Sequence, residues 1–154
     1  MEPFDKWISP EGQRLKRDLS CDVVALALQN RAGLDITWPC VIGHRNEKYK
    51  YITVRYGKGI AGKVISSGRQ MEITSFPNGI LGKSIDYPIM LAEQLISAYA
   101  VPLLCDDSPK GALLIGYRDV HVFTEEEKSR VMEVARGVQS SLSTHYATYR
   151  RDRF

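Results

Sequence analysis

Apolar and polar residues alternate along this chain with two periods, and the first clear segments have the period of strands. "CDVVALALQ" (Cys21–Gln29) is apolar almost throughout, which is typical of a central strand buried on both faces. After the turn residues "NRAG" comes "LDITWPCVIG" (Leu34–Gly43), which alternates well enough to pair with the first run as a hairpin. Pro39 interrupts this second run, so we expect the strand to bulge, bend or lie at an edge near Trp38.

Three later segments also have strand character. "QMEITSF" (Gln70–Phe76) predicts a third strand, and "PNGILGK" (Pro77–Lys83) after it is expected to be a loop. "SAYAVPLLC" (Ser97–Cys105) and "GALLIGYRD" (Gly111–Asp119) predict a hairpin around the turn "DDSPKG" (Asp106–Gly111), because Asp, Ser, Pro and Gly favour tight turns.

Helical spacing marks both ends of the chain. An N-terminal helix is expected within about residues 1–19, where Leu15 and Leu19 stand four positions apart. Thr124 and Glu127 form the capping box of a helix over residues 124–149. The apolar stripe of that helix is Val131, Val134, Val138, Leu142 and Tyr146. An antiparallel sheet of five to six strands with a long helix from each end of the chain is an α+β domain, so residues 1–154 are interpreted as one domain.

Two shorter helices are expected between the strands. The first runs from about Gly59 to Ser67 and ends at Gly68, because glycine is favoured just beyond a helix C-terminus. The second runs from about Pro88 to Leu95, with a proline near its first position, where a missing N–H costs nothing. Asp86 or Tyr87 is expected to cap it.

Composition narrows the function classes. The net charge of +3 is too small to indicate a nucleic-acid-binding protein, and the Lys, Arg and Tyr residues of "RNEKYKYITVRY" (Arg45–Tyr56) fit a solvent-facing strand or loop. No apolar run reaches the ~18 residues of a membrane span, and "MEPFDKW" lacks the shape of a signal peptide, so we expect a cytoplasmic location and no membrane partner. The three cysteines lack CxxC spacing and the histidines are scattered, so no metal or cofactor is predicted.

The segment "VRYGKGIAGKVISSGRQMEI" (Val54–Ile73) places three glycines around a helix start. Free N–H groups and the helix dipole make such starts favourable for anions. The GxGxxG order of Gly57, Gly59 and Gly62 is a weak signal by itself, since tight turns need glycine in any case. The phosphate-loop order GxxxxGK[ST] is absent.

The order of elements, together with "YGKGIAGKVISSGR" and "YAVPLL…KGALLIGY", resembles a GAF domain over essentially the whole chain. Within that family the chain is most similar to the NreA-type nitrate receptors of Gram-positive bacteria. This resemblance implies a cytoplasmic receptor that binds nitrate and modulates the sensor histidine kinase of a two-component system that regulates nitrate respiration. It also implies an apolar ligand pocket lined by Trp38, Ile60, Ala61, Tyr87, Pro88 and Ile89.

The residues themselves favour a similar ligand. Two short helix starts that face one pocket would present backbone donors to a small anion. Lys58 and Lys63 flank the first start but are expected to be solvated. A pocket without a fixed cation disfavours strongly hydrated anions such as phosphate or sulfate and suits a monovalent, weakly hydrated ion such as nitrate.

Other functions stay open at this point. The pocket of a GAF effector module also suits another small metabolite, such as an amide, an amino acid or a purine. The free methionine-R-sulfoxide reductases are GAF domains of similar length with "GVCG" at the turn and "ACD" later, but this chain has "GIAG", with Ala61 in place of the thiol, and no "ACD". No catalytic residue is predicted, so the chain is interpreted as a binder and not as an enzyme. The terminal helices are the expected surface for a homodimer or a kinase, although packing on the sheet would use the same apolar residues.

Overall fold

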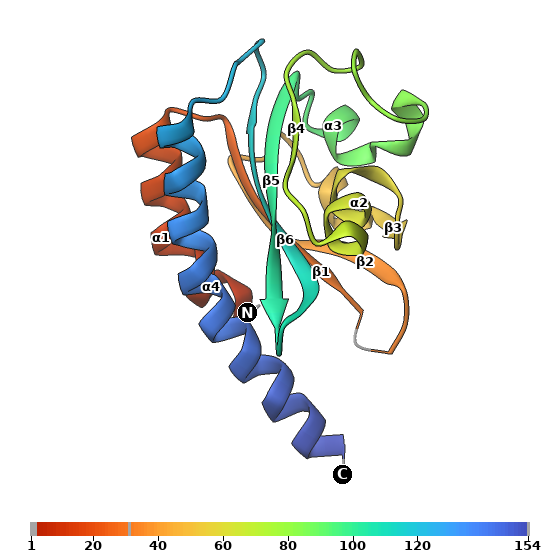
Figure 1. The fold of residues 1–154 in the computed structure, drawn as a ribbon, viewed down its shortest axis with the longest axis vertical. Coiled ribbons are helices and arrows are strands. Elements are labelled where there is room, and N and C mark those ends of the chain that lie inside the picture. Colours follow the sequence, from red (N-terminus) through yellow and green to blue (C-terminus); the bar gives the residue numbers. More distant parts are fainter. Residues whose placement is uncertain (1–2, 31, 154) are drawn as a thin grey trace.

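A six-stranded antiparallel sheet with the order β3-β2-β1-β6-β5-β4 forms the middle of the computed structural model (Figure 1). The structure describes residues 3–30 and 32–153, with side chains for residues 9–30 and 32–142. The strands are β1 (Val23–Gln29), β2 (Asp35–Ile42), β3 (Thr53–Arg55), β4 (Met71–Ile73), β5 (Ser97–Cys105) and β6 (Ser108–Tyr117). The predicted α+β architecture is therefore confirmed.

Helices cover both faces of this sheet. The long α1 (Pro3–Leu19) and α4 (Glu125–Arg153) lie side by side on one face, and α2 (Gly59–Ser67) and α3 (Pro88–Ala92) lie on the other (Figure 1). Two single turns of 3₁₀ helix, η1 (Lys48–Tyr51) and η2 (Ser84–Asp86), connect them to the strands. Among the described residues, no helix combines the length and the apolar character that crossing a membrane requires.

The two faces of the sheet differ in side-chain size. The face under α1 and α4 carries large residues of β1, β5 and β6, among them Leu26, Tyr99 and Leu113. The α2 and α3 face carries alanines from the same three strands, which let short helices approach the sheet closely. They are Ala25, Ala27, Ala98, Ala100 and Ala112.

A β-bulge in β2 fixes which of its side chains reach each face. Leu26 pairs with Cys40 and Leu28 with Thr37, so Ala27 faces both Trp38 and Pro39. The expected irregularity near Pro39 is therefore present. One extra residue reverses the alternation of side chains along a strand. As a result, Trp38 faces α2 and α3, whereas Cys40 belongs to the opposite cluster.

Several predicted boundaries were wrong. The β5–β6 turn is only Asp106-Asp107, with φ of 51° and 64°, so β6 begins at Ser108 and not at Gly111. Positive φ at both central residues is the geometry of a two-residue hairpin turn, and Asp tolerates it. Helix α3 stops at Ala92 and not at Leu95, because Gln94 has φ of 53°. The third predicted strand is reduced to β4, and β3 lies within Arg45–Tyr56, which was expected to be a solvent-facing strand or loop.

Helix α4 also extends beyond its predicted end, whereas α1 stays within its predicted range of about residues 1–19. Helix α4 continues to Arg153, and α1 begins at Pro3 although Pro10 lies inside it. The predicted stripe residues Val131, Val134 and Val138 are buried against the sheet, as is Leu142. The side chain of Tyr146, the last predicted member of the stripe, lies outside the described residues.

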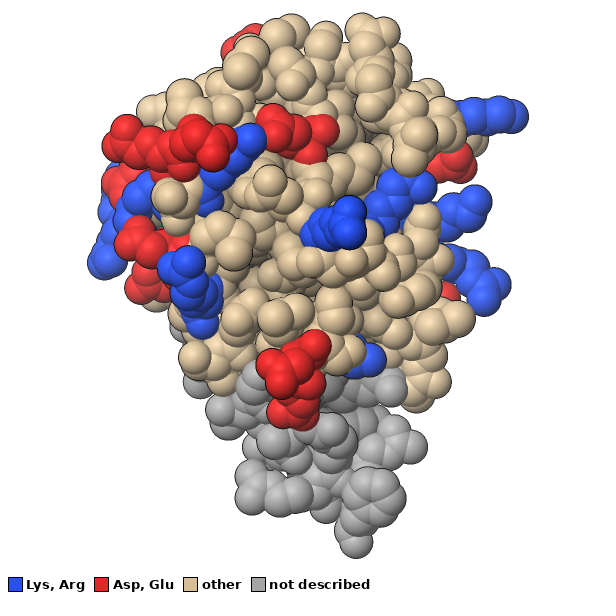
Figure 2. Space-filling model, viewed as in Figure 1, with Lys and Arg blue, Asp and Glu red and all other residues tan. Residues whose placement is uncertain are grey.

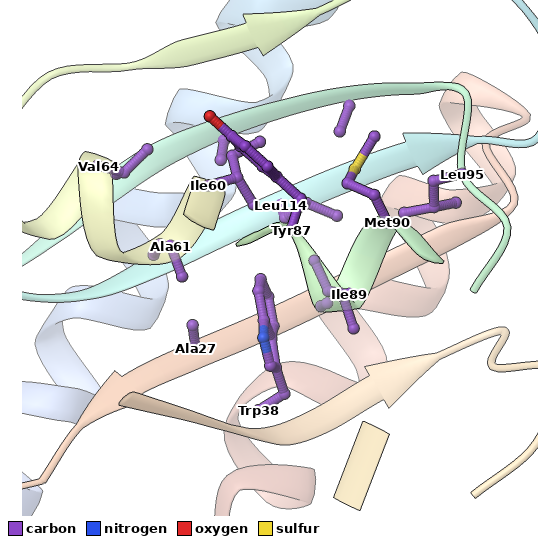
Figure 3. Close-up of a cluster of buried hydrophobic side chains, with 14 of the residues drawn as sticks. Ala27, Trp38, Ile60, Ala61, Val64, Tyr87, Ile89, Met90, Leu95 and Leu114 are labelled. Atoms are coloured by element: carbon purple, nitrogen blue, oxygen red, sulfur yellow. The ribbon is translucent and has the colours of Figure 1, made fainter. Parts of the chain in front are cut away.

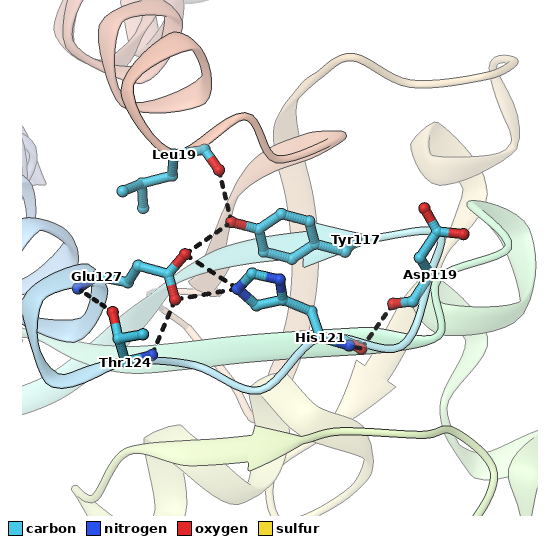
Figure 4. A network of polar contacts seen from close by, with 7 residues as sticks. Leu19, Tyr117, Asp119, His121, Thr124 and Glu127 are labelled. Atoms are coloured by element: carbon cyan, nitrogen blue, oxygen red, sulfur yellow. Dashed lines mark hydrogen bonds and ion pairs between the residues drawn. The ribbon is translucent and has the colours of Figure 1, made fainter.

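A polar network joins the end of α1, the end of β6 and the start of α4 (Figure 4). The Tyr117 hydroxyl donates to the Leu19 carbonyl at 2.7 Å, and the Tyr117 ring stacks on His121 with centroids 3.8 Å apart. Both Glu127 carboxylate oxygens lie 3.0 Å from His121 Nε2. The predicted capping box is confirmed, because Thr124 N–H donates to Glu127 Oε1 and Glu127 N–H donates to Thr124 Oγ1.

Substitution Glu127→Gln should destabilise the protein in a pH-dependent way. Burial raises the pKa of the Glu127 carboxyl, but the Thr124 N–H and His121 outweigh it, and the pKa lies below its ordinary 4.5. A carboxyl with a depressed folded-state pKa stabilises the fold above that ordinary value, and the contribution is lost as the pH falls through the folded-state pKa. We expect a loss of about 1–2 kcal/mol at pH 7 that shrinks below about pH 4. Urea unfolding of the unaltered protein and the variant at pH 7 and below about pH 4 measures this loss. The control is Glu126→Gln, at an exposed residue in the first turn of α4. An equal loss at both pH values would contradict the role of the ionised Glu127 carboxylate.

Candidate functional site

A small cavity lies between β2 and the N-terminal ends of α2 and α3 (Figure 3). Its volume of about 10 Å³ is enough for roughly one water molecule. All six residues predicted from the family resemblance lie around it, and Val54 and Gly59 complete the lining: Trp38, Val54, Gly59, Ile60, Ala61, Tyr87, Pro88 and Ile89. Val54 was missed because it belongs to β3, whose three residues are too few to show a period.

The two helix starts contact each other closely because glycine is present at the first of them. Gly59 has φ of +66°, and a Cβ atom there would lie 3.0 Å from the Asp86 carbonyl oxygen at the entry to α3. A Cβ atom at Gly62 would lie 2.6 Å from the Arg55 carbonyl oxygen. The glycines therefore serve the approach of one backbone segment to another.

Neither helix start is capped by a side chain at its N-cap residue, which is Lys58 for α2 and Tyr87 for α3. The first N–H groups of a helix have no acceptor within the helix. Asp86, one of the two predicted caps, does not cap α3: its carboxylate accepts from the Lys83 N–H at 3.1 Å instead. The nine-residue α2 therefore begins without a side-chain cap, and Ile60 and Ala61 of its first turn line the cavity.

Tyr87 and Trp38 form opposite sides of the cavity (Figure 3). The Tyr87 hydroxyl donates to the Leu81 carbonyl at 2.7 Å. This hydrogen bond connects the loop before α3 to the N-cap residue of that helix. Burial raises the pKa of this hydroxyl, so Tyr87 stays neutral. Trp38 is 3% exposed and lies on this face of β2 together with Ile36, two residues earlier. Both rings contribute apolar surface.

The site is uncharged, because none of the eight lining residues is ionisable except the neutral Tyr87. Lys58 is exposed, and the Lys63 ammonium donates to the Gly57 carbonyl at 3.3 Å, outside the lining. Figure 2 shows lysine and arginine side chains along the surface on the α2 side. No Lys or Arg side chain therefore lines the cavity, which lies at the start of α2.

The cysteines lie on the other face of the sheet. Cys21, Cys40 and Cys105 are buried in the cluster under α1 and α4, and none lines the cavity. Burial raises the pKa of the Cys21 thiol to about 12, so it is not a thiolate. Among the residues with described side chains, no three His, Cys, Asp or Glu gather as metal ligands would.

The segment considered as a nucleic-acid face, Arg45–Tyr56, forms η1 and β3. Tyr49 is buried in the cluster under α2 and α3, and Tyr51 is exposed. The two rings therefore do not form a common stacking surface for bases.

No protein-family model and no curated protein sequence matches the chain. Solved structures do match it. A hypothetical protein, SA1058, from S. aureus is 36% identical, with a TM-score of 0.63, over 69% of this chain and 88% of that one. An NreA protein from Staphylococcus aureus, mutated in its nitrate binding site, is 28% identical, with a TM-score of 0.73, over 87% of this chain and 98% of that one. The GAF domain of a phosphoenolpyruvate-protein phosphotransferase from Coxiella burnetii is 19% identical, with a TM-score of 0.80, over 96% and 87%.

More distant structures share only the fold. A domain of a two-component sensor histidine kinase protein from Sinorhizobium meliloti is 15% identical, with a TM-score of 0.76, over 99% of each chain. The free methionine-R-sulfoxide reductase of Neisseria meningitidis is 16% identical, with a TM-score of 0.71, over 91% of this chain and 81% of that one. The same fold therefore occurs in a signalling protein and in an enzyme, so the function has to be argued from the residues of the site.

Substitution Gly62→Ala should destabilise the protein although alanine favours helix. A Cβ atom 2.6 Å from the Arg55 carbonyl oxygen would force the turn before α2 to shift. We expect a net loss of about 1–3 kcal/mol in the free energy of unfolding. Gly137→Ala in α4 is the control, because nothing lies within 4 Å of the added atom, and it should gain about 0.5–1 kcal/mol. Denaturant unfolding measures both; equal gains would show that the glycine turn has room for a side chain.

Proposed function

The chain belongs to the GAF domain proteins and resembles NreA, and from this premise we propose that it is a receptor for a small monovalent anion, nitrate. The observation that carries the proposal is the composition of the cavity: all six residues expected from the resemblance surround one uncharged space at the start of α2. The similar NreA structures are described as carrying mutations in a nitrate binding site.

The chemistry of the lining favours nitrate over more strongly hydrated anions. Backbone N–H groups donate to a charged acceptor with about 1.5–3 kcal/mol each before costs. The ion must leave water without meeting a lysine or arginine, and this desolvation is most costly for sulfate and phosphate. After roughly 4 kcal/mol or more for association, the affinity is in the micromolar range or weaker.

The cavity is so small that binding of the ion would require a change in structure. A space of about 10 Å³ does not hold a four-atom ion, so binding moves the starts of α2 and α3 apart. An equilibrium between the two arrangements then responds to nitrate through its differential affinity for them. Such a displacement is the change that a partner protein would detect.

The proposed role is regulatory and cytoplasmic. The receptor would modulate a sensor histidine kinase of a two-component system, with α1 and α4 as the surface for the kinase or for a second copy of the chain. An enzymatic role is not proposed, because the cavity has no thiol, and its one ionisable side chain, Tyr87, is buried and neutral. A GAF effector module for an uncharged metabolite is the alternative, since the lining itself is apolar.

Nitrate should bind to the purified protein with a one-site isotherm and a dissociation constant of roughly 1–1000 µM. Isothermal titration in a buffer of bulky anions measures it, with nitrite, chloride and sulfate as parallel titrants. Sulfate should give little heat because of its hydration. Folded protein that gives no heat with any anion would contradict the nitrate proposal and favour an uncharged ligand.

Filling the cavity should weaken this binding. Ala61 lines the cavity and is 1% exposed, so Ala61→Val places two methyl groups where the ion would sit. We expect at least about a tenfold weaker affinity, and Trp38→Phe should weaken binding through lost contact area. The matched control is Ala135→Val, the same change at a 1% exposed alanine on α4, across the sheet. Equal affinities of the two valine variants, both folded by circular dichroism, would exclude the cavity as the site.

A further inference from the structure

Helix α3 has only five residues, yet its first residues form one side of the cavity. A single helical turn is not stable by itself in water, because nucleation fixes several dihedrals for few hydrogen bonds. The position of α3 must therefore be set by contacts with the rest of the protein. Its N-terminal end contacts the glycine turn, so the C-terminal end is where an anchor is needed.

Two arginines hold that C-terminal end. The Arg118 side chain donates from Nε to the carbonyl oxygen of Glu93, the C-cap residue of α3, at 2.8 Å, and from Nη2 to the Glu93 carboxylate at 2.8 Å. Arg45 donates from Nη1 to the Ala92 carbonyl at 3.1 Å, and its backbone N–H donates to Glu93 Oε1 at 2.8 Å. Guanidinium groups at free carbonyls are favourable at a helix C-terminus.

Glu93 is fully buried, with 0% exposure. Its Oε1 receives the two bonds just described, and its Oε2 has no hydrogen-bond partner within the described part of the chain. A buried carboxylate needs a paired cation, and the only salt bridge that Glu93 makes among the described residues is with Arg118. Removal of Arg118 would therefore leave the buried Glu93 carboxylate without a paired cation at this end of α3.

Arg118 is itself attached to the sheet. Its backbone N–H donates to the Asp22 carboxylate at 2.7 Å, beside the start of β1, and Nη2 lies 3.3 Å from the Gly43 carbonyl, just after β2. The arginine thus connects α3 to the ends of two strands. We call Arg45, Glu93 and Arg118 the α3 clamp; none of them lines the cavity.

We propose that the α3 clamp is the positioning device of the anion site: it holds the C-terminal end of α3 in place, so that only the N-terminal end, with Tyr87, Pro88 and Ile89, moves away from α2 when the ion binds. This inference rests on the proposed function of the cavity. A helix that is anchored at one end loses less conformational freedom on binding than one that is free at both ends, so loosening the clamp weakens affinity without touching any ligand contact.

The test is the nitrate affinity of Arg118→Met, which keeps the length of the apolar stem and removes the donors. We expect a roughly tenfold rise in the dissociation constant, measured by titration well below the unfolding temperature. Arg118→Lys keeps the charge but not the planar fork, so it should recover part of the loss. The matched control is Arg130→Met, which removes an arginine of similar exposure that pairs with Asp18 and Glu133 on the α1 and α4 side. Unchanged affinity in Arg118→Met, or equal losses in both methionine variants, would overturn the proposal.

Hydrogen exchange in ligand-free protein tests the α3 clamp independently of whether the cavity binds nitrate. In ligand-free protein, Arg118→Met should increase exchange of the amides of residues 89–95 while leaving β5 and α4 protected. If the unaltered protein does not bind nitrate, this result still supports the clamp as the device that positions α3. Unchanged exchange in that segment would overturn it whatever the cavity binds. Glu93→Gln combined with Arg118→Met should lose no more affinity than Arg118→Met alone, because the pair acts as a unit.

Discussion

Burial of the central sheet on both faces is the constraint from which the rest of this structure follows. Every residue of β1 is buried, as is β6 from Gly111 to Tyr117. Antiparallel sheets commonly leave one face to water, so this one needs two covers. The two terminal helices provide one. The chain between β3 and β5 must provide the other within about forty residues, and it does so with α2, η2 and α3 over a face of small alanines.

A cover made of short helices has more helix ends than one long helix, and each end leaves backbone groups without partners. Where the two starts meet, a Cβ atom at Gly59 would lie 3.0 Å from the Asp86 carbonyl oxygen, and neither N-cap side chain makes a capping hydrogen bond. Trp38 and Tyr87 then enclose the uncapped α2 start in apolar surface. A small uncharged space at a helix start is thus a consequence of how this face is covered.

The sequence predicted most where local signals agree with the tertiary structure. The limits of α2 and β5 were predicted to the residue, since Gly68 ends the helix in a left-handed conformation and β5 is apolar after Ser97. The six cavity residues came from family resemblance; no period or spacing brings Trp38 near Ala61. The alternation of β2 alone would place Trp38 and Cys40 on one face, and only the bulge separates them. Glu93 was not anticipated, because a lone glutamate near the end of a helix usually lies on the surface.

The two layers are joined where β6 ends. Consecutive residues of an extended chain point to opposite sides, and here the alternation separates two polar anchors. Tyr117 reaches the end of α1 and the start of α4 through Leu19 and Glu127, whereas Arg118 reaches α3 through Glu93. Tyr117 and Arg118 are adjacent in the sequence, at the end of β6, which pairs with β1 on one side and β5 on the other. The proposed displacement of α3 would therefore reach the strand end that contacts the terminal helices through two adjacent residues.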